Sequence, residues 1–485
     1  MLNPQKIISL VGAIMLFVAA MLIFPLLVSL VYQEGDTIAF VQSILIVVVV
    51  GGMMFLQGRK KRDINLRSGF AVVTFGWLAM AFAGALPFYL SGAIPNFTDC
   101  VFESMSGFST TGSSILGPHL LIESLPKGLL FWRSLTHWIG GMGIILLSLA
   151  ILPLLGVGGM QLYRAEFPGP VKDKLTPRIK TTASILWGVY VLISAIEFIL
   201  LWIGGMTWFD AACHTFGTMA TGGFSTHTAS IAAFDSRFIH YVIIIFMFIA
   251  GTNFALHFRL LKGKPGFYWK SREFRVYVVL IGIFSLVLFA NNLIHQQFNS
   301  VEESFRQSLF HVIAIITTTG YGAADWELWG GFAQVLLVSL MLVGGMAGST
   351  GGGPKVVRIM IVFRQIIVEL KRLIHPQAVL PLRIGHVLVD EGIVRNVLSF
   401  ILAFMLILLI STAIISAFDI DIVTSFGASI ACLSNIGPGL GDVGPTDDFG
   451  HFPSTVKWIL VMLMMLGRLE VFTVMVLFSR HFWRK

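Results

Sequence analysis

Four short stretches of the chain place a glycine beside small, uncharged residues, and turns of this composition can present backbone carbonyls to a cation. Glycine adopts left-handed conformations that let successive carbonyls point the same way. Stacked rings of carbonyl oxygens can replace the water shell of a cation. The lead glycines lie 98 to 117 residues apart, in the stretches Thr110-Thr111-Gly112-Ser113, Ala220-Thr221-Gly222-Gly223, Thr318-Thr319-Gly320-Tyr321-Gly322 and Asn435-Ile436-Gly437-Pro438-Gly439.

We predict that the four turns converge on one axis and bind a cation there. A single such turn would more simply be the glycine that ends a helix, and it is the fourfold repetition that favours the ion-binding interpretation. The predicted ligands are the backbone carbonyls of Thr110, Thr111, Gly112, Ala220, Thr221, Gly222, Thr318, Thr319, Gly320, Asn435, Ile436 and Gly437.

A glycine-rich run between 344 and 354 is the first candidate for a gate. Six of its first ten residues are glycine, and such a run cannot hold a straight helix. We interpret it as a mobile loop beneath the turns, although small residues are also common where membrane helices pack together. The predicted gate residues in this loop are Gly345, Gly348, Ser349, Thr350 and Gly351.

Arg468 is the second candidate, because a charged side chain inside an apolar span is costly and is a functional hypothesis by default. On the axis it would repel a dehydrated cation and limit flow. The alternative is a structural ion pair with Glu470 or Glu197. Arg468 follows Gly467, the last of four landmark glycines that lie 25 to 30 residues after the lead glycines: Gly141, Gly251, Gly345 and Gly467.

These residues must be positioned by membrane helices. The chain is 56% hydrophobic and only 12% charged, which excludes a water-facing globular surface and predicts an all-α polytopic membrane protein. Ten apolar runs are near or above the roughly 20 residues needed to cross a bilayer. They cover 7–32, 38–57, 70–92, 128–158, 181–205, 238–261, 276–294, 331–363, 393–418 and 456–478.

The basic residues fix the expected topology. With ten spans, most of the 33 Lys and Arg residues fall on one side, including the clusters Arg59–Arg62 and Arg164–Lys174. Because cytoplasmic loops carry this excess, both termini are predicted to be cytoplasmic. The net charge of +8 is therefore explained by topology rather than by nucleic acid. Acidic residues gather on the other side, where they either attract cations or simply avoid the basic side.

After two N-terminal spans, the pattern of span, short apolar segment, glycine turn and span occurs four times. The short segments, 98–109, 209–219, 303–317 and 421–433, are too short to cross and are predicted to be re-entrant helices whose carboxyl ends favour a cation. We expect four pseudo-repeated units around one pore. The predicted divisions are 1–67 for the extra spans and 68–163, 164–270, 271–375 and 376–485 for the units.

The chain resembles the TrkH/TrkG/KtrB family of bacterial potassium uptake proteins over essentially its whole length. Thr318-Thr319-Gly320-Tyr321-Gly322 is similar to the T-V-G-Y-G filter of potassium channels. The other three turns depart from it, with Ser113, Gly223 and Pro438 after their lead glycines. The two extra spans are similar to TrkH and TrkG, whereas KtrB lacks them. The resemblance implies potassium uptake across the bacterial inner membrane, gated by the unit-three loop and by an arginine at Arg468.

The resemblance also implies a partner. The chain contains no G-x-x-x-x-G-K-S/T phosphate loop and no G-x-G-x-x-G between a strand and a helix, so no nucleotide is expected on it. A TrkA-like cytosolic subunit that binds NAD or ATP is implied instead, together with a homodimer in the bilayer.

A symporter and a membrane enzyme are the alternatives to a potassium-conducting pore. A secondary symporter that couples potassium to protons or sodium would need intramembrane carboxylates, for which Glu197 and Glu470 are the candidates. A membrane enzyme would need a polar cluster. The histidines form no metal-binding spacing, and we expect His137, His214, His240 and His311 to be satisfied or to face solvent.

Overall fold

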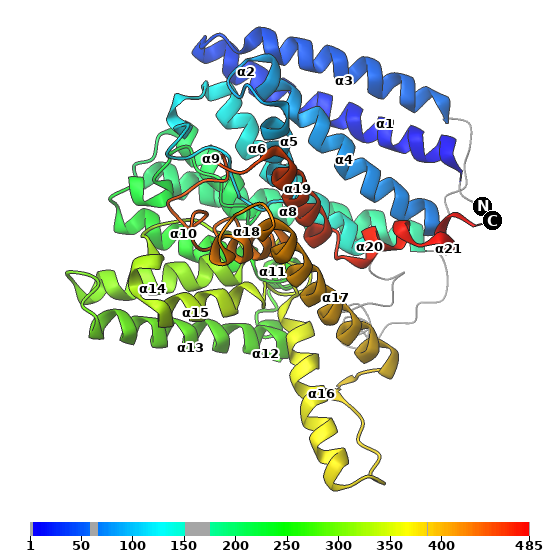
Figure 1. Cartoon of the computed structure of the whole chain (residues 1–485), viewed down its shortest axis with the longest axis vertical. Coiled ribbons are helices and arrows are strands. Elements are labelled where there is room, and N and C mark those ends of the chain that lie inside the picture. Colours follow the sequence, from blue (N-terminus) through cyan, green and yellow to red (C-terminus); the bar gives the residue numbers. More distant parts are fainter. Residues whose placement is uncertain (1–2, 59–65, 151–174, 386, 485) are drawn as a thin grey trace.

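The computed structural model describes residues 3–58, 66–150, 175–385 and 387–484, and these residues are mainly helical (Figure 1). The β-structure in this part of the chain is one antiparallel hairpin of β1 (Arg383–Ile384) and β2 (Val387–Leu388). The helices are α1 (Pro4–Met21), α2 (Ile23–Tyr32), α3 (Thr37–Gln57), α4 (Leu66–Leu90), α5 (Phe97–Phe108), α6 (Lys127–Ala150), α8 (Leu175–Ile203), α9 (Trp208–Met219), α10 (Arg237–Ala250), α11 (Phe254–Leu261), α12 (Phe267–Lys270), α13 (Arg272–Ile294), α14 (Val301–Ile316), α15 (Gly331–Met341), α16 (Val356–Ile374), α17 (Glu391–Ser416), α18 (Ile422–Ser434), α19 (Ser454–Arg468), α20 (Phe472–Met475) and α21 (Arg480–Trp483). Four 3-10 turns join them: η1 (Ile122–Ser124), η2 (Ser230–Ala233), η3 (Trp326–Trp329) and η4 (Val476–Phe478).

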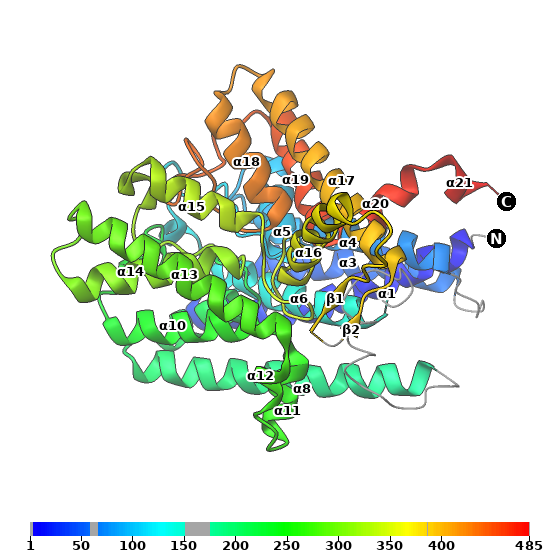
Figure 2. The ribbon, with the colours of Figure 1, turned by 90° about the horizontal axis from the view of Figure 1, so that it is seen from below.

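One arrangement occurs four times along the chain: a long helix, a short and mostly buried helix, and a third, apolar helix. The groups begin with α4-α5-α6, α8-α9-α10, α13-α14-α15 and α17-α18-α19, and we refer to them as units one to four. Figures 1 and 2 show the groups side by side around a common centre. Helices α1 and α3 pack together and against α4, at the flank of unit one.

The short helices α5, α9, α14 and α18 begin at a defined signal. Each has an N-cap side chain that accepts a hydrogen bond from a backbone N–H of its first turn, which satisfies donors that a helix leaves unpaired. The four caps are Asn96, Thr207, Ser300 and Asp421. The helices lie where the four short segments were predicted, and most of their residues are buried.

The long helices present apolar faces to the outside of the molecule. On α3, for example, Ile38, Leu45 and Leu56 are each more than 60% exposed. Because an exposed apolar face of this extent is unfavourable in water, these surfaces fit a lipid environment. Six described helices are long and apolar enough to cross a membrane, or eight if two bent pairs each count as one span.

The second spans of units two, three and four differ from the straight spans expected from the sequence. In unit two α10 and α11 meet at 103°, and in unit four α19 and the segment 472–478 meet at 109°. The span expected over 331–363 is divided by a loop between α15 and α16. Asn253 caps the start of α11, and Glu470 and Val471 have positive φ. The bends in units two and four therefore coincide with local departures from helical backbone geometry.

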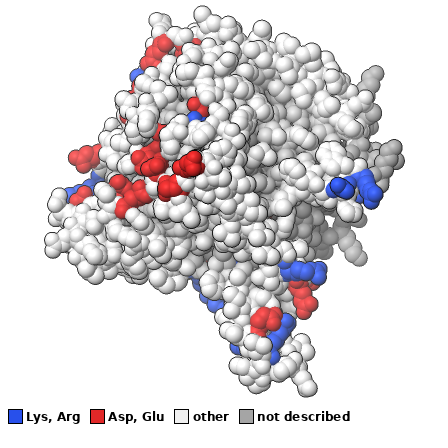
Figure 3. Space-filling view, in the orientation of Figure 1, with Lys and Arg blue, Asp and Glu red and all other residues white. Residues whose placement is uncertain are grey.

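The span expected over 128–158 begins as α6, but 151–158 lie outside the described residues, as do the basic clusters Arg59–Arg62 and Arg164–Lys174. Both chain ends lie on one side of the molecule in Figures 1 and 2. Figure 3 shows a group of Asp and Glu on one part of the visible surface, whereas the Lys and Arg near the chain ends stand alone and those around α16 are mixed with acidic residues.

Candidate functional site

The four glycine turns share one backbone conformation. Each short helix is followed by a residue with φ between 51° and 60°: Thr110, Thr221, Thr318 and Asn435. The next N–H in each turn donates to the carbonyl five residues earlier, at 2.8–3.0 Å, in the pairs Thr111–Ser106, Gly222–Gly217, Thr319–Ala314 and Ile436–Ala431. Two residues after the first positive φ comes a second, between 73° and 105°, at Gly112, Gly223, Gly320 and Gly437.

This equivalence corrects the predicted register of unit two. Gly223, and not Gly222, has the positive φ of a lead glycine. Ala220 has an ordinary helical conformation and forms the C-cap of α9, so it is not a member of the ring. The set that matches Thr110, Thr111 and Gly112 is therefore Thr221, Gly222 and Gly223. Two adjacent glycines leave the register open from sequence alone.

The four lead glycines close a ring of turns. A Cβ added to Gly112 would overlap the carbonyl oxygen of Gly222, and one on Gly223 would overlap that of Thr319. A Cβ on Gly320 would overlap the carbonyl of Ile436. One on Gly437 would lie 3.1 Å from the carbonyl of Thr111, which returns to unit one. Each turn thus packs against the next, and the order of the units around the axis is one, two, three, four.

The ring holds buried carbonyls that no other group uses. Thr110, Thr111, Thr221, Gly222, Thr318, Thr319, Asn435 and Ile436 are buried, and within the described part of the chain their carbonyl oxygens accept no hydrogen bond. Buried backbone carbonyls are nearly always paired with a donor. The side chains behind the ring do bond one another. Thr317 and Thr319 hydroxyls lie 2.8 Å apart, and Asn435 Nδ2 donates to Thr111 Oγ1 at 2.9 Å. The free carbonyls are therefore suited to a cation.

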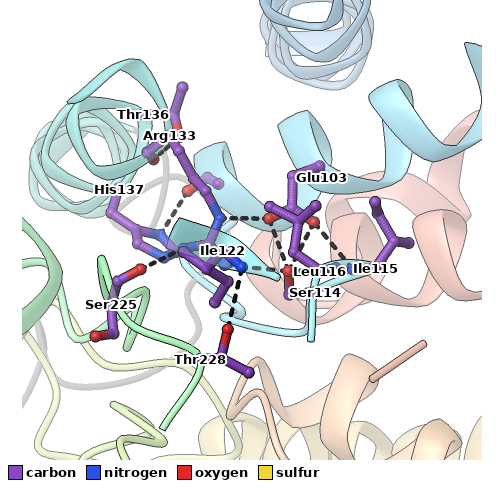
Figure 4. Close-up of polar contacts among 11 residues, drawn as sticks. Glu103, Ser114, Ile115, Leu116, Ile122, Arg133, Thr136, His137, Ser225 and Thr228 are labelled. Atoms are coloured by element: carbon purple, nitrogen blue, oxygen red, sulfur yellow. Dashed lines mark hydrogen bonds and ion pairs between the residues drawn. The ribbon is translucent and has the colours of Figure 1, made fainter. Parts of the chain in front are cut away.

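On one side of the ring, a buried ion pair within unit one reaches across to unit two (Figure 4). Arg133 Nε donates to Glu103 Oε1 at 2.5 Å, and Arg133 Nη1 donates to the carbonyl of Ser225 at 2.8 Å. The guanidinium carbon lies 3.5 Å from the ring centre of Phe224. Arg133 and Glu103 are 2% and 1% exposed. The two residues lie 30 positions apart and share no motif, so their pairing is not visible in the sequence.

The glycine-rich loop lies directly under the ring. Gly352 N donates to Thr318 Oγ1 at 2.6 Å. Thr350 Oγ1 bonds the carbonyls of Met219 and Ala250, at 3.0 and 3.1 Å. A Cβ on Gly352 would lie 2.7 Å from the carbonyl of Ser434. The loop therefore touches the helix ends of units two, three and four.

Arg468 ties this loop to unit one. Its Nη1 donates to the carbonyl of Thr350 at 2.9 Å, and its Nη2 donates to the carbonyl of Gly140 at 3.0 Å. The side chain is 2% exposed. The alternative of an ion pair with Glu470 or Glu197 is wrong, because Glu470 pairs with Arg358 and Arg468 forms no ion pair in the described chain.

The landmark glycines also need a one-residue correction. A Cβ on Gly467 would overlap the carbonyl of Leu433, and one on Gly140 would overlap that of Phe108. Leu433 and Phe108 each lie two residues before the first positive φ of their turn. Gly140 is therefore the equivalent of Gly467, and Arg468 stands where unit one has Gly141.

The end of the ring opposite the glycine-rich loop, which is the predicted outer end, opens into a hollow lined by Ser114, Gly223, Gly320, Gly437 and Asp447, among others. An acidic patch stands beside it: Asp447 lines the hollow, and the carboxylates of Glu327 and Asp447 both lie next to Gly444, another lining residue. Burial raises the pKa of Glu327, and the neighbouring charges of Asp325, Asp447 and Asp442 raise it further. Among the buried histidines, His137, His214, His240 and His311 each bond a backbone carbonyl.

The chain is similar to known proteins along its whole length. The family described as "TrkH: Cation transport protein" matches residues 37–485. The Trk system potassium uptake protein TrkH of Escherichia coli K12 is 43% identical over 490 residues, covering 99% of each chain. The protein of the same name from Halomonas elongata is 40% identical and covers 100% of each. The crystal structure of the potassium transporter TrkH from Vibrio parahaemolyticus superposes with a TM-score of 0.92 at 37% identity, with 100% of both chains covered.

Proposed function

The chain belongs to the TrkH family of cation transport proteins, and from that premise we propose that it takes up potassium through the ring of four turns. The observation that carries the proposal is the set of buried, unused carbonyls in that ring. Carbonyl oxygens are hard, neutral ligands that replace the hydration shell of potassium without trapping it as carboxylates would. The similar proteins are named as potassium uptake proteins and as a potassium transporter, which supports potassium as the ion.

The ligands we propose are the carbonyls of Thr110, Thr111 and Gly112 and of their equivalents in the other units, with Gly223 replacing Ala220 in unit two. Because only unit three carries the Thr-Gly-Tyr-Gly signature at Thr319–Gly322, the ring is unequal. We therefore expect weaker discrimination between potassium, rubidium and sodium than in a symmetric channel.

The loop under the ring is proposed as the gate. Its contacts with units two, three and four, and the bridge from Thr350 through Arg468 to Gly140, would close the path below the ring. Gly345, Gly348, Ser349 and Gly351 belong to the same loop. A positive guanidinium on the exit path would also repel a dehydrated cation.

The assembly and its setting are proposed as well. We place the chain in the bacterial inner membrane with both termini in the cytoplasm, as a homodimer under the control of a TrkA-like subunit that binds NAD or ATP. The unit boundaries at 67/68, 163/164, 270/271 and 375/376 belong to the same proposal. The relatives are named as proteins of a Trk system, which implies more than one component. We therefore expect a regulatory partner, and we propose that this partner moves the loop.

A proton-coupled symporter is the second candidate, and Glu197 is the residue that favours it. Its side chain is fully buried on α8, and it has no ion-pair partner in the described chain. Glu470, the other candidate, is neutralised by Arg358. A buried carboxyl group without a compensating cation is a candidate proton-binding group.

One experiment separates the two functions. Purified protein in liposomes that contain a pH-sensitive dye is given an inward potassium gradient, with the membrane-permeant anion thiocyanate on both sides to dissipate the electrical potential. Potassium entry with no change in dye signal supports the pore. A dye signal that follows potassium entry, and that disappears in Glu197→Gln, would establish coupling. No potassium entry at all, with or without the regulatory subunit, would overturn both.

A further inference from the structure

A line of side chains runs behind the outer half of the ring and joins three of the four units. It begins at Glu103 and Arg133 in unit one and continues through the Ser225 carbonyl of unit two. Ser225 Oγ lies 2.9 Å from His214 Nε2. The carbonyl of His214 accepts a hydrogen bond from the hydroxyl of Tyr321, in unit three, at 3.0 Å. We call this connected set, Glu103, Arg133, Ser225, His214 and Tyr321, the collar.

The collar uses a position that recurs on the short helices. Glu103, His214 and His311 each lie seven residues before the first positive φ of their turn. Each holds the chain just after the turn. Glu103 accepts from Ile115 N at 3.1 Å, and His214 bonds Ser225. His311 Nε2 lies 3.4 Å from Ala323 N. In unit four the equivalent residue is Ala428, which has no side chain that could do this.

Glu103 differs from the two histidines because it is acidic and is matched by a partner from the same unit. Arg133 also donates to Ser114 Oγ at 3.1 Å, and Ser114 donates to both carboxylate oxygens of Glu103. Arg133 therefore satisfies Glu103, holds the exit of turn one and reaches across to turn two. A planar guanidinium with several donors suits such a branched role, whereas a lysine ammonium does not.

We propose that the Glu103–Arg133 pair is a positioning clamp that sets the spacing of turns one and two and thereby the preference of the ring for potassium over sodium. The inference rests on the proposed function. Neither residue is proposed to touch the ion. They act through Ser225, Phe224 and Ser114, which lie one or two residues after the lead glycines of turns one and two. The pair carries no net charge, so a cation entering the hollow, which Arg133 also lines, meets no unbalanced guanidinium.

The pair has two separable effects: it keeps the entrance electrically neutral, and it holds turns one and two at a fixed spacing. Different variants remove one effect or both. Glu103→Gln removes the negative partner and leaves Arg133 charged beside the entrance, so both the transport rate and the selectivity should fall. The double variant Glu103→Gln/Arg133→Met restores neutrality but lacks the clamp. Its rate should therefore recover relative to Glu103→Gln, while its selectivity stays low.

Lys457→Met is the matched control. Lys457 forms another buried ion pair at the outer side, with Asp99 at 2.6 Å, and it joins unit four to the start of α5. It contacts no residue of the four turns in the described chain. Loss of a buried ion pair destabilises this variant too, but the collar is untouched.

The test is a bi-ionic measurement of potassium and sodium uptake in liposomes, for the wild type and each variant, after size-exclusion chromatography shows equal folded protein. We expect the potassium-to-sodium ratio to fall about three- to tenfold in Glu103→Gln and in the double variant. We expect a smaller fall in Ser114→Ala, and no change in Lys457→Met. A ratio that stays at the wild-type value in Glu103→Gln, whatever its rate, would overturn the clamp.

If Glu103→Gln and the double variant do not fold, Ser114→Ala decides, because it removes one hydroxyl and leaves the ion pair in place. An unchanged ratio in Ser114→Ala would then count against the proposal. A wild-type protein that carries no potassium in this assay would instead sink the proposed function, so the two failures are distinguishable.

Discussion

At the scale of single residues, the four turns depend on backbone conformations that side chains other than glycine rarely adopt. Three of the four first positions are threonine, at φ 51–60°, and each costs roughly 1–2 kcal/mol relative to a right-handed conformation. Such strain persists only where the surroundings over-determine it, and it concentrates at functional sites. The lead glycines remove that cost at the second position, where a Cβ has no room in three of the four units.

Gly320→Ala tests this requirement. The methyl group would overlap the carbonyl oxygen of Ile436, at a φ of 73°, so both the turn and its neighbour must shift. We expect potassium transport to fall at least about tenfold, measured as rubidium uptake into liposomes. Gly330→Ala is the control, since Gly330 has φ 87° and open space around it. That variant should lose roughly 1–3 kcal/mol of stability, because φ 87° with ψ 161° is a conformation that residues other than glycine rarely adopt, and it should keep normal uptake. Equal losses in both variants would assign the effect to strain alone.

Sequence reasoning located these residues but not their register or their partners. Fourfold repetition of a glycine beside small polar residues is visible in the sequence, because the ring needs the same backbone four times. The choice between Gly222 and Gly223 depends on φ and on contact with Thr319, which spacing does not encode. Glu103 and Arg133 lie 30 residues apart and share no motif, so only the folded chain reveals their pairing.

At the scale of elements, the second spans of units two, three and four depart most from their sequence prediction. Apolar length predicts a span, but it does not predict the bends of 103° and 109° or the break between α15 and α16. The glycine-rich run did indicate the break. The N-caps of the short helices, such as Ser300 with Glu303 three residues later, are a local signal that sequence reasoning could also have used to place their starts.

The loop between α15 and α16 yields a prediction of increased transport. Gly352 has no positive φ, and an added Cβ would lie 2.7 Å from the Ser434 carbonyl and 2.9 Å from Asn435 Cβ. Gly352→Ala should therefore wedge the loop away from the ring and raise rubidium uptake by about two- to fivefold without the regulatory partner. Gly282→Ala, on α13 with nothing near it, should leave uptake unchanged. Reduced uptake in Gly352→Ala would show that the loop does not block the path.

Arg468 gives a second prediction at this scale. Arg468→Ala removes both carbonyl contacts and the charge, so ion flux should rise by about an order of magnitude, since two charge-assisted hydrogen bonds hold the loop. Arg468→Lys keeps the charge but cannot bridge both carbonyls, and we expect an intermediate flux. Flux assays in liposomes at matched protein density check both. Unchanged flux in Arg468→Ala would remove Arg468 from the gate.

At the scale of the whole molecule, we propose that the acidic side chains beside the hollow raise the local cation concentration, an effect that salt would screen. Composition predicted a polytopic helical protein, because long apolar runs are what insertion into a bilayer requires. The order of the units around the axis could not be predicted, since it depends on contacts between residues about a hundred positions apart.

The acidic patch predicts a pH dependence. The raised pKa of Glu327 means that this carboxyl group takes up a proton at a higher pH than an ordinary glutamic acid. Its negative charge is present above that pKa and is lost as the external pH falls. Uptake at low external potassium should therefore fall by about two- to fivefold on mild acidification, and high salt should remove the effect. In Glu327→Gln the dependence should be weaker. A variant profile that coincides with the wild type would exclude this residue.

The claim that the four turns form one cation site is tested most directly by anomalous diffraction from crystals soaked in rubidium. The account predicts at least one rubidium peak on the axis, encircled by the carbonyls of Thr110, Thr221, Thr318, Asn435 and the residues that follow them. It also predicts that the peak is lost in Gly320→Ala. A well-ordered ring with no peak, or rubidium bound only at the outer carboxylates, would contradict it.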